Sequence, residues 1–319
     1  MAHSAVRKHL RLVTFNTRRF TADDGTSSVA AIASHLASLK PDVLCLNEVD
    51  LHKRPTALAD VQRALSGAYG RNFSVQFFGH VDDFYGNAIL SAYSTSNVRR
   101  VRLDGGSVVK HKHRTHRIHR GLLVCEVHLP EYMGAKLLRV ATTHLDHMSS
   151  AERTIQTRHV LDSILLPSAP SLLSLPTVLL GDLNALRKRD YTLQHWAHLQ
   201  ARNRARGWAA PADDDAPPLG CLHLLAQRGL SDLYRQRHTR EPMNENDFTA
   251  HVDDPSYRID SVHADVVCRR MFTVRNAWVD RGALVGSDHF PLVVDLDWRT
   301  CDIQDSNNSS ADRDITCKL

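Results

Sequence analysis

Polar side chains that can bind a cation or move a proton recur beside short apolar runs of this sequence. Eight of them combine carboxylates, amides and imidazoles: Asn16, Glu48, His144, Asp182, Asn184, Asp260, Asp288 and His289. Strand ends are rigid positions that can present side chains to a shared cleft. A single carboxylate after a strand is more often an ordinary turn residue. Eight residues of these types are harder to explain as turns, so they form our candidate active site.

The elements that must position these side chains can be read from apolar patterning. Apolar runs predict strands at 10–15, 42–46, 87–91, 122–127, 137–143, 177–180, 259–263 and 291–296. Three stretches show helical spacing: 29–39 before Pro41, 58–65 closing at Gly67, and 157–165. Connections between strands after residue 70 are short, which favours antiparallel pairing. The pattern predicts one α/β domain, 1–300, in which two packed sheets are flanked by helices.

Composition sets the broad class of protein. The 319 residues are 42% hydrophobic, with no run of the ~20 apolar residues that a membrane-spanning helix needs. No signal peptide is recognisable at the N-terminus, so we expect an intracellular protein. The six cysteines are widely scattered, which favours reduced thiols over a zinc or disulfide framework. Segment 203–220 is rich in Ala, Pro and Asp and is predicted to be a surface excursion.

The charge balance bears on the partner. A formal charge of +5 with 20 histidines suits an anionic substrate but is too small to identify nucleic acid. The densest basic segment is 110–120, K-H-K-H-R-T-H-R-I-H-R. It could be a solvated hairpin or loop, or equally a strip that faces phosphate.

Seven strings carry a resemblance to a known family. They are T-F-N-T (14–17), L-N-E-V (46–49), Y-G-N-A-I-L-S (85–91), T-H-L-D-H (143–147), G-D-L-N-A (181–185), R-I-D-S-V (258–262) and G-S-D-H-F-P-L (286–292). In order and spacing they resemble the motifs of the endonuclease/exonuclease/phosphatase superfamily over residues 10–298. The resemblance implies a four-layered α/β sandwich of two mainly antiparallel sheets. It also implies a metal-dependent phosphoesterase.

The resemblance also implies roles for individual residues. Glu48 would be the main metal ligand, supported by Asn16 and Asp288. Asp182 would orient or deprotonate the attacking water, and Asn184 would hold that water or a phosphate oxygen. His289, paired with Asp260, and His144 would contact the scissile phosphate. Asn87 and Arg120 are secondary candidates for substrate contact.

Elementary chemistry agrees with these roles. Phosphoryl transfer needs charge neutralisation and an aligned nucleophile more than covalent catalysis. Oxygen ligands favour Mg²⁺, with Mn²⁺ as a substitute, and no cluster offers the Cys and His ligands of zinc. The expected enzyme is a phosphodiesterase or nuclease. A lipid- or sugar-phosphate hydrolase is the alternative, and a non-catalytic binding protein on the same fold is the third hypothesis.

The C-terminus adds a separate hypothesis. Residues 301–319 are polar and are predicted to be a disordered tail. The last three, Cys317, Lys318 and Leu319, resemble the Ser-Lys-Leu peroxisomal address, which an import receptor would read. The tripeptide predicts a protein that is cytoplasmic or is imported into a peroxisome-type organelle. Separately, we expect a monomer.

Overall fold

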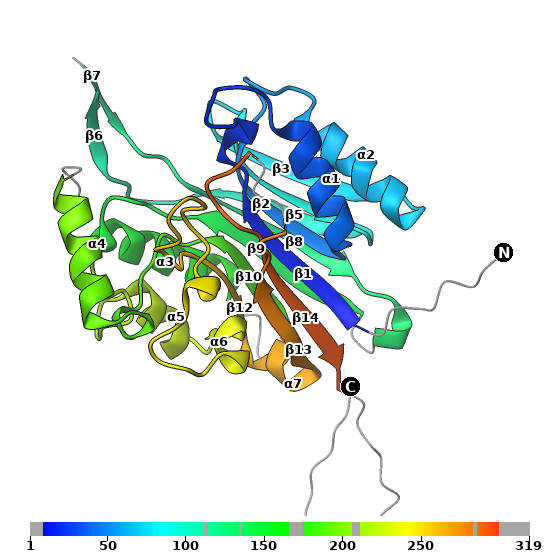
Figure 1. The fold of residues 1–319 in the computed structure, drawn as a ribbon. Helices are drawn as coiled ribbons and strands as arrows, with labels where there is room; N and C mark the ends of the chain where they lie inside the picture. Colours follow the sequence, from blue (N-terminus) through cyan, green and yellow to red (C-terminus); the bar gives the residue numbers. More distant parts are fainter. Residues whose placement is uncertain are drawn as a thin grey trace, which may run out of the picture.

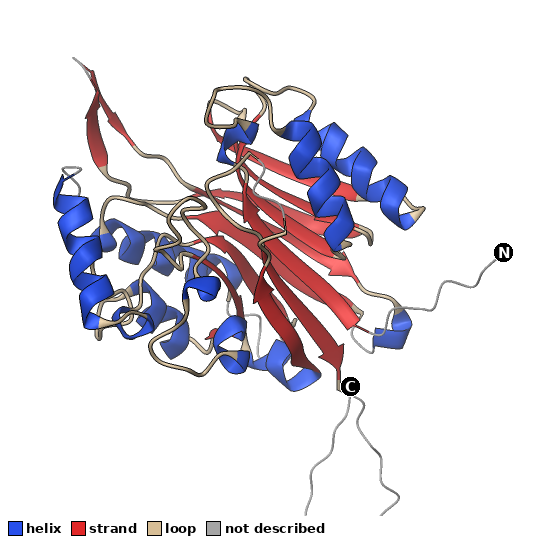
Figure 2. Cartoon of the chain, in the orientation of Figure 1, coloured by secondary structure: helices blue, strands red, loops and turns tan. Residues whose placement is uncertain are grey.

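Two six-stranded sheets pack face to face, and helices cover their outer faces (Figure 1). This arrangement is seen in a computed structural model, which describes residues 9–111, 114–133, 136–165, 175–205, 211–282 and 286–299. Figure 2 shows the helices gathered on the two outer sides of the stacked sheets. The predicted α/β sandwich of four layers is confirmed, with sheets that are mixed rather than purely antiparallel.

The first sheet has the order β13-β14-β1-β2-β4-β3. Its strands are β1 (His9–Asn16), β2 (Val43–Asp50), β3 (Ser74–Val81), β4 (Tyr85–Ser91), β13 (Phe272–Val279) and β14 (Leu292–Trp298). All neighbours are antiparallel except β1 and β2, which run parallel. A parallel pair needs a crossover connection. Here that connection contains α1 (Val29–Leu39).

The second sheet has the order β11-β12-β10-β9-β8-β5. Its strands are β5 (Thr95–Arg102), β8 (Gly121–His128), β9 (Leu137–His144), β10 (Thr177–Asp182), β11 (Ser231–Asp232) and β12 (Asp260–Ala264). Again one central pair, β9 and β10, is parallel, and α3 (Ser150–Ile164) lies in the connection between them. Both sheets therefore bring the carboxyl ends of two neighbouring parallel strands to one edge.

The remaining helices lie in the connections. They are α2 (Ala57–Tyr69), α4 (Leu193–Ala205), α5 (Cys221–Gln227), α6 (Leu233–Arg237) and α7 (Val266–Met271), with 3₁₀ turns at Arg18–Phe20, Glu131–Met133, Lys188–Asp190 and Glu245–Asp247. All eight predicted strands and all three predicted helices are present. Their ends differ from the prediction, most of all in α3, which begins at Ser150 rather than at 157. The second helix continues past Gly67 to Tyr69 and is capped by Gly70, whose φ of 67° is left-handed.

Apolar clusters fill the spaces between the layers. Leu12, Cys45 and Leu123 belong to the cluster between the sheets. Val13 and Leu44 face the other way, into the cluster beneath α1 and α2. Because each central strand is buried on both faces, its sequence is a continuous apolar run rather than an alternating one. The two sheets are thereby fixed against each other, and so are the strand ends that carry the candidate site.

A separate two-stranded ribbon lies in the connection between the neighbouring strands β5 and β8 of the second sheet. Strands β6 (Val108–His111) and β7 (Arg114–Arg117) pair with each other and with neither large sheet. Figure 1 shows the ribbon projecting away from the sheets. Of the basic segment 110–120, residues 110–111 and 114–117 belong to this arm, and residues 118–120 lead from it into β8.

The prediction of a surface excursion at 203–220 is wrong for its central carboxylate. Asp214 is fully buried, and it accepts hydrogen bonds from the Ser150 hydroxyl at 2.6 Å and the Leu186 amide at 3.0 Å. Arg153 contributes a buried ion pair at 2.9 Å. Composition gave no sign of this anchor, because the partners of Asp214 are distant in sequence.

Removing the cation of this pair tests the anchor. We expect Arg153→Met to lower the free energy of unfolding by about 3–5 kcal/mol, because it leaves a buried carboxylate without its counter-ion. Urea denaturation measures the loss, with Arg228→Met as the control, since the Arg228 side chain is 52% exposed. A loss below about 1 kcal/mol would contradict an anchoring role.

Some predictions concern residues beyond the described ranges. The tail 301–319, with Cys317, Lys318 and Leu319, lies outside the described residues. Within them, no helix is both long and apolar enough to cross a membrane. Cys45, Cys125, Cys221 and Cys268 are free and buried.

Candidate active site

Strand register brings the central candidates together. Asp182 ends β10, where it is paired in register with His144 at the end of β9 and with Asp260 at the start of β12. Asn16 ends β1 and is paired with Asn47 of β2. These cross-strand pairs place side chains from five strands at the same edge of the sandwich.

Glu48 owes its direction to a break in the sheet. The pairing of β2 with β4 shifts register between Leu46 and Val49, and Glu48 has a left-handed φ of 55°. Bulges of this kind re-aim side chains beside functional sites. A positive φ in a residue other than glycine costs free energy, so it is kept where surrounding structure imposes it. The result is a carboxylate that is 24% exposed in an otherwise buried strand.

Asp182 is the most densely contacted carboxylate of the site. Its Oδ1 accepts the Asn184 amide at 3.0 Å, and its Oδ2 accepts Asn16 Nδ2, also at 3.0 Å. The same Oδ2 lies 3.6 Å from His144 Nε2 and 3.8 Å from His289 Nε2. Asn16 also donates to Glu48 Oε1 at 3.3 Å, so its amide links the two carboxylates.

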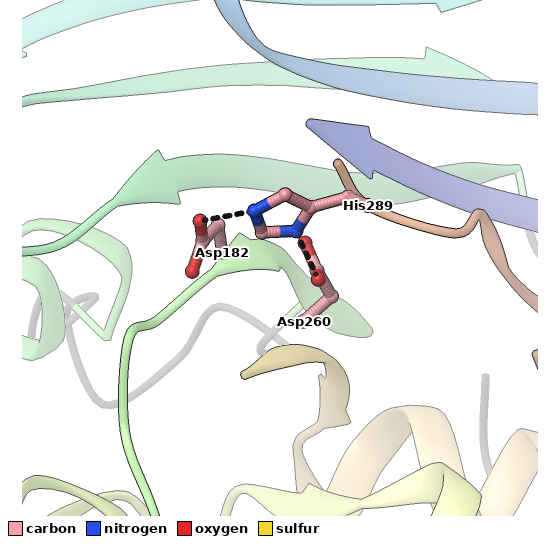
Figure 3. Close-up of side chains that lie close together, drawn as sticks. All are labelled: Asp182, Asp260 and His289. Carbon is pink, nitrogen blue, oxygen red and sulfur yellow. Dashed lines mark hydrogen bonds and ion pairs between the residues drawn. The ribbon is translucent and has the colours of Figure 1, made fainter. Parts of the chain in front are cut away.

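The imidazole of His289 lies between two buried carboxylates, as Figure 3 shows. Its Nδ1 donates to Asp260 Oδ2 at 2.7 Å, and its Nε2 faces Asp182. One ligand atom from each of Asp182, Asp260 and His289 can be chosen so that all lie within 4.8 Å of one another. The trio is therefore one group that could hold a metal ion.

Burial and charge set the protonation of this group. Burial alone would lower the pKa of His289, but the Asp260 charge and hydrogen bond, with Asp182 and Asp288, raise it to about 10. Burial and the charge of Asp260 raise the pKa of Asp182 to about 7, against the opposing effects of His289 and Asn16. Near neutral pH, His289 is thus an imidazolium, and Asp182 is a carboxylate that can take a proton.

Arg120 holds two further imidazoles. Its guanidinium donates to Nδ1 of His144 at 3.1 Å and to Nδ1 of His147 at 3.2 Å, which leaves the ring proton of each on Nε2. Burial, and next the Arg120 charge, lower the pKa of His144 well below its ordinary value and that of His147 to about 4. Among the described residues, no Asp or Glu oxygen lies within 4.0 Å of this buried guanidinium.

Asp288 lies at the open side of the site. Its carboxylate is 3.4 Å from His251 Nδ1 and 4.0 Å from Arg18 Nε. Burial alone would raise the pKa of Asp288, but the hydrogen bond from His251 and the charges of His289, His251 and Arg18 lower it to about 2. The group is therefore an anion over the whole physiological range of pH.

One cavity of about 850 Å³ gathers most of the predicted residues. Seven of them line it: Glu48, Arg120, His144, Asp182, Asn184, Asp288 and His289. Asn16 and Asp260 lie behind this lining and orient Glu48, Asp182 and His289 through the contacts given above. Asn87 is fully buried between the sheets, where it accepts Asn47 Nδ2 and donates to the Gly121 carbonyl, both at 2.8 Å. Its predicted contact with substrate stays a prediction, and these bonds favour a structural link.

Sequence reasoning gave no role to several residues at the site. Asn47 accepts the Asp182 backbone amide at 2.9 Å, and His147, His251 and Arg19 line the cavity. His147 was within reach of motif reasoning, because it closes the T-H-L-D-H string. His251 and Arg19 had no such signal, since only the tertiary fold brings them to the cavity.

Comparisons with known proteins identify the family and the fold. A family model described as the Endonuclease/Exonuclease/phosphatase family matches residues 13–289. Among curated proteins, none matches the sequence. Several solved structures share the fold, all below 25% identity.

Three of these structures illustrate the range. An endonuclease/exonuclease/phosphatase from Beutenbergia cavernae is 22% identical, with a TM-score of 0.61 over 92% of this chain and 72% of its own. Danio rerio TDP2 bound to a single-strand DNA product is 18% identical, with a TM-score of 0.56 over 91% and 99%. The human Nocturnin catalytic domain with sulfate is 16% identical, with a TM-score of 0.57 over 92% and 94%.

Proposed function

The chain belongs to the endonuclease/exonuclease/phosphatase family, and from this premise we propose that it is a magnesium-dependent phosphodiesterase that cleaves a P–O bond by in-line attack of water. The observation that carries the proposal is the convergence, at one cavity, of a carboxylate with a raised pKa, an imidazolium and two partly exposed acids. Phosphoryl transfer depends on this combination of a positioned nucleophile and charge neutralisation.

The residues fit a hard divalent cation. Glu48 and Asp288 offer carboxylate oxygens to the same cavity, and among the described residues no Lys or Arg nitrogen lies within 4.0 Å of Glu48. Mg²⁺ takes such ligands and keeps several waters. Asn16 would support Glu48 by its hydrogen bond, because its own oxygen already accepts the Arg18 amide. When bound, the ion would neutralise charge on a phosphoryl oxygen.

The trio of Asp182, Asp260 and His289 suits proton handling better than metal binding. A raised pKa keeps His289 protonated at neutral pH, and an imidazolium has no lone pair for a metal. Asp182 would take the proton of the attacking water, for which a pKa near the working pH is favourable. Asn184, whose backbone amide bonds to Asp182, would hold that water.

Cationic and neutral donors would meet the phosphate. His289, oriented by Asp260, would donate its Nε2 proton to a phosphoryl oxygen, and His144 would donate from its own Nε2. Arg120 would contribute its positive charge. This guanidinium is buried, and among the described residues no carboxylate pairs with it. These donors are preorganised by buried contacts, which is what makes electrostatic stabilisation effective.

A nucleic acid or nucleotide diester is the substrate class that we favour. The cavity is far larger than one phosphate requires, and basic side chains such as Arg19, Arg117 and Arg120 line it. The structural match to a TDP2 bound to a DNA product points in the same direction. A phosphatase or phospholipase activity on a lipid or sugar phosphate would need less of this basic lining.

A substrate panel tests the proposal. We expect magnesium-dependent hydrolysis of bis-(p-nitrophenyl) phosphate and of oligonucleotides, with little turnover of phosphomonoesters or phospholipids. EDTA should abolish the activity, and Mg²⁺ or Mn²⁺ should restore it. Activity that survives the chelator, or a preference for monoesters, would refute the proposal.

The Asp260–His289 pair predicts a change in pH dependence. In the folded protein the pKa of His289 is raised, so its cationic form persists up to about pH 10. Asp260→Asn removes the carboxylate that raises this pKa, while burial still lowers it, so the cation should be lost at a much lower pH. We expect kcat/KM to fall about 10–100-fold at pH 8 and less at pH 6.

Parallel pH–rate profiles of the wild type and Asp260→Asn measure this effect. The control is Asp162→Asn, a substitution at a side chain that is 72% exposed. If kcat/KM declines at the same alkaline pH in the wild type and in Asp260→Asn, His289 does not act as the proposed proton donor.

We retain the C-terminal Cys317, Lys318 and Leu319 as a proposed peroxisomal address. A fluorescent fusion that ends in the natural tripeptide should enter punctate organelles, and deletion of Leu319 should abolish this. Unchanged localisation would refute the address.

A further inference from the structure

The described residues of the arm formed by β6 and β7 (108–111 and 114–117) pair with neither large sheet, and Val109, His116 and Arg117 of this arm belong to the wall of the cavity. We propose that this arm is a clamp for single-stranded nucleic acid, which binds the backbone beside the phosphate that is cleaved. The inference rests on the proposed function, because it assigns a substrate class to the same cavity. Its support comes from charge, position and anchoring.

The charge of the arm is of one sign. No Asp or Glu occurs between Asp104 and Glu126, while five Lys or Arg and four His occur in 110–120. Lys110, His116 and Arg117 are exposed, and among the described residues no carboxylate lies within 4.0 Å of any of them. A solvated surface hairpin of average composition would mix both signs. Unbalanced positive charge on a projecting ribbon suits a polyanion.

The arm reaches the reaction centre through the cavity. Val109, His116 and Arg117 line the same cavity as Asp182 and His289. Three further residues line the same cavity: Ile118, His119 and Arg120. They connect the arm to His144 and His147, which Arg120 contacts. A chain whose phosphates follow this strip would present one phosphate to the catalytic groups and the next ones to the arm.

Other parts of the cavity offer apolar contacts. Leu186, Pro211, Ala212, Tyr257 and Ile259 belong to its lining. A substrate that fits both parts needs a charged backbone and flat, less polar groups along its length. Single-stranded nucleic acid has both, because its bases are unpaired and can contact apolar or aromatic side chains.

Two carboxylates, the buried Asp146 and the half-buried Glu152, hold the root of the arm to the segment that follows His144. Asp146, two residues after His144, accepts the Ser107 amide at 2.7 Å and the Ser107 hydroxyl at 2.8 Å. Glu152 accepts the Gly106 amide at 2.6 Å. Arg117 donates back to the Gly106 carbonyl at 2.9 Å. The arm is therefore attached in a fixed position relative to His144, as a clamp requires.

Binding without cleavage tests the clamp directly. Fluorescence anisotropy in EDTA would compare fluorescein-labelled oligothymidylates of 3 and 12 nucleotides. We expect the wild type to bind the 12-mer at least tenfold more tightly than the 3-mer. We expect Lys110→Gln/Arg117→Gln to reduce 12-mer affinity about tenfold.

The salt dependence gives an independent readout. For single strands, log K falls with log[salt] by about 0.7 for each phosphate neutralised. The double variant should therefore flatten this slope by about 1.4. The matched control is Arg63→Gln/Arg228→Gln, which removes the same charge from exposed arginines that are paired elsewhere with Asp60 and Asp162. It should leave affinity within about twofold.

Three outcomes would overturn the clamp. They are 12-mer affinity that the arm variant does not change, equal affinity for a 12-base-pair duplex, and arm-dependent binding of phosphatidylglycerol vesicles without any preference for longer oligonucleotides. The proposed function is judged separately by hydrolysis of bis-(p-nitrophenyl) phosphate with Mg²⁺. A protein that binds the 12-mer through its arm but hydrolyses no diester would keep the clamp and refute the proposed function.

Discussion

Asp182→Asn is expected to lower kcat by about three orders of magnitude on any substrate that the wild type hydrolyses, which corresponds to about 4 kcal/mol of transition-state stabilisation. Asparagine keeps the shape of the side chain and can still accept the Asn184 amide, but it cannot take a proton from water. General-base catalysis contributes typically 10²–10⁴-fold. The measurement is kcat at saturating substrate and Mg²⁺.

The same substitution should not destabilise the fold. Burial and the charge of Asp260 raise the pKa of Asp182 from 3.8 to about 7, so ionisation of this carboxyl costs the folded state free energy that accrues above about pH 4 and is complete above about pH 7. An amide removes this buried charge. We therefore expect the thermal midpoint of Asp182→Asn at pH 8 to be no lower than that of the wild type, which is the usual relation between stability and a strained active site.

Asp162→Asn is again the control, because it makes the same chemical change on the surface. Near-normal turnover by Asp182→Asn would refute its role as the base. An unfolded variant would refute the stability argument, because Asp182 would then contribute structure rather than reactivity.

The fold could be predicted from sequence wherever strands are buried on both faces. Central strands such as β1, β2 and β8 read as continuous apolar runs, so their existence was evident. The strands that sequence patterning missed lie at sheet edges or in the arm: β3, β5, β13, β11, β6 and β7. Edge strand β5 reads T-S-N-V-R-R-V-R, because an edge exposes one side and carries charge against aggregation.

The candidate site was predictable to the level of strand ends. Those ends meet because β1–β2 and β9–β10 are parallel pairs whose carboxyl ends share an edge. The bulge that aims Glu48 depends on β4, and the place of His251 beside Asp288 depends on a loop far along the chain. Local patterning cannot supply such contacts, since they form only when distant segments pair.

Asn87 and Asp214 show that sequence patterning also assigns binding or surface roles to residues that are buried. Both have side chains that, in sequence, fit either a binding role or a surface loop. Both prove to be fully buried and hydrogen-bonded within the protein. The number and distance of their partners decide the role, and neither is visible in the sequence.

Glu48→Gln is expected to reduce kcat by about 10³ at millimolar Mg²⁺ and to weaken metal binding at least tenfold. A hard cation prefers an anionic oxygen, and the amide that replaces it carries no charge. Isothermal titration with Mn²⁺ measures the loss of affinity without relying on turnover. Glu131→Gln, an exposed change outside the cavity, is the control.

Glu48→Gly separates the metal role from any structural one. The backbone at Glu48 has a φ of 55°, a conformation that costs a non-glycine residue about 1–3 kcal/mol and costs glycine almost nothing. Glycine should therefore remove the same carboxylate while relieving strain, so the protein should unfold at no lower temperature than the wild type and yet be inactive. A glycine variant that is active, or one that binds Mn²⁺ normally, would mean that the ion is held by other residues of the cavity. The register shift in β2 would then be explained by the need to direct the Glu48 carboxylate into the cavity, at the cost of a strained backbone.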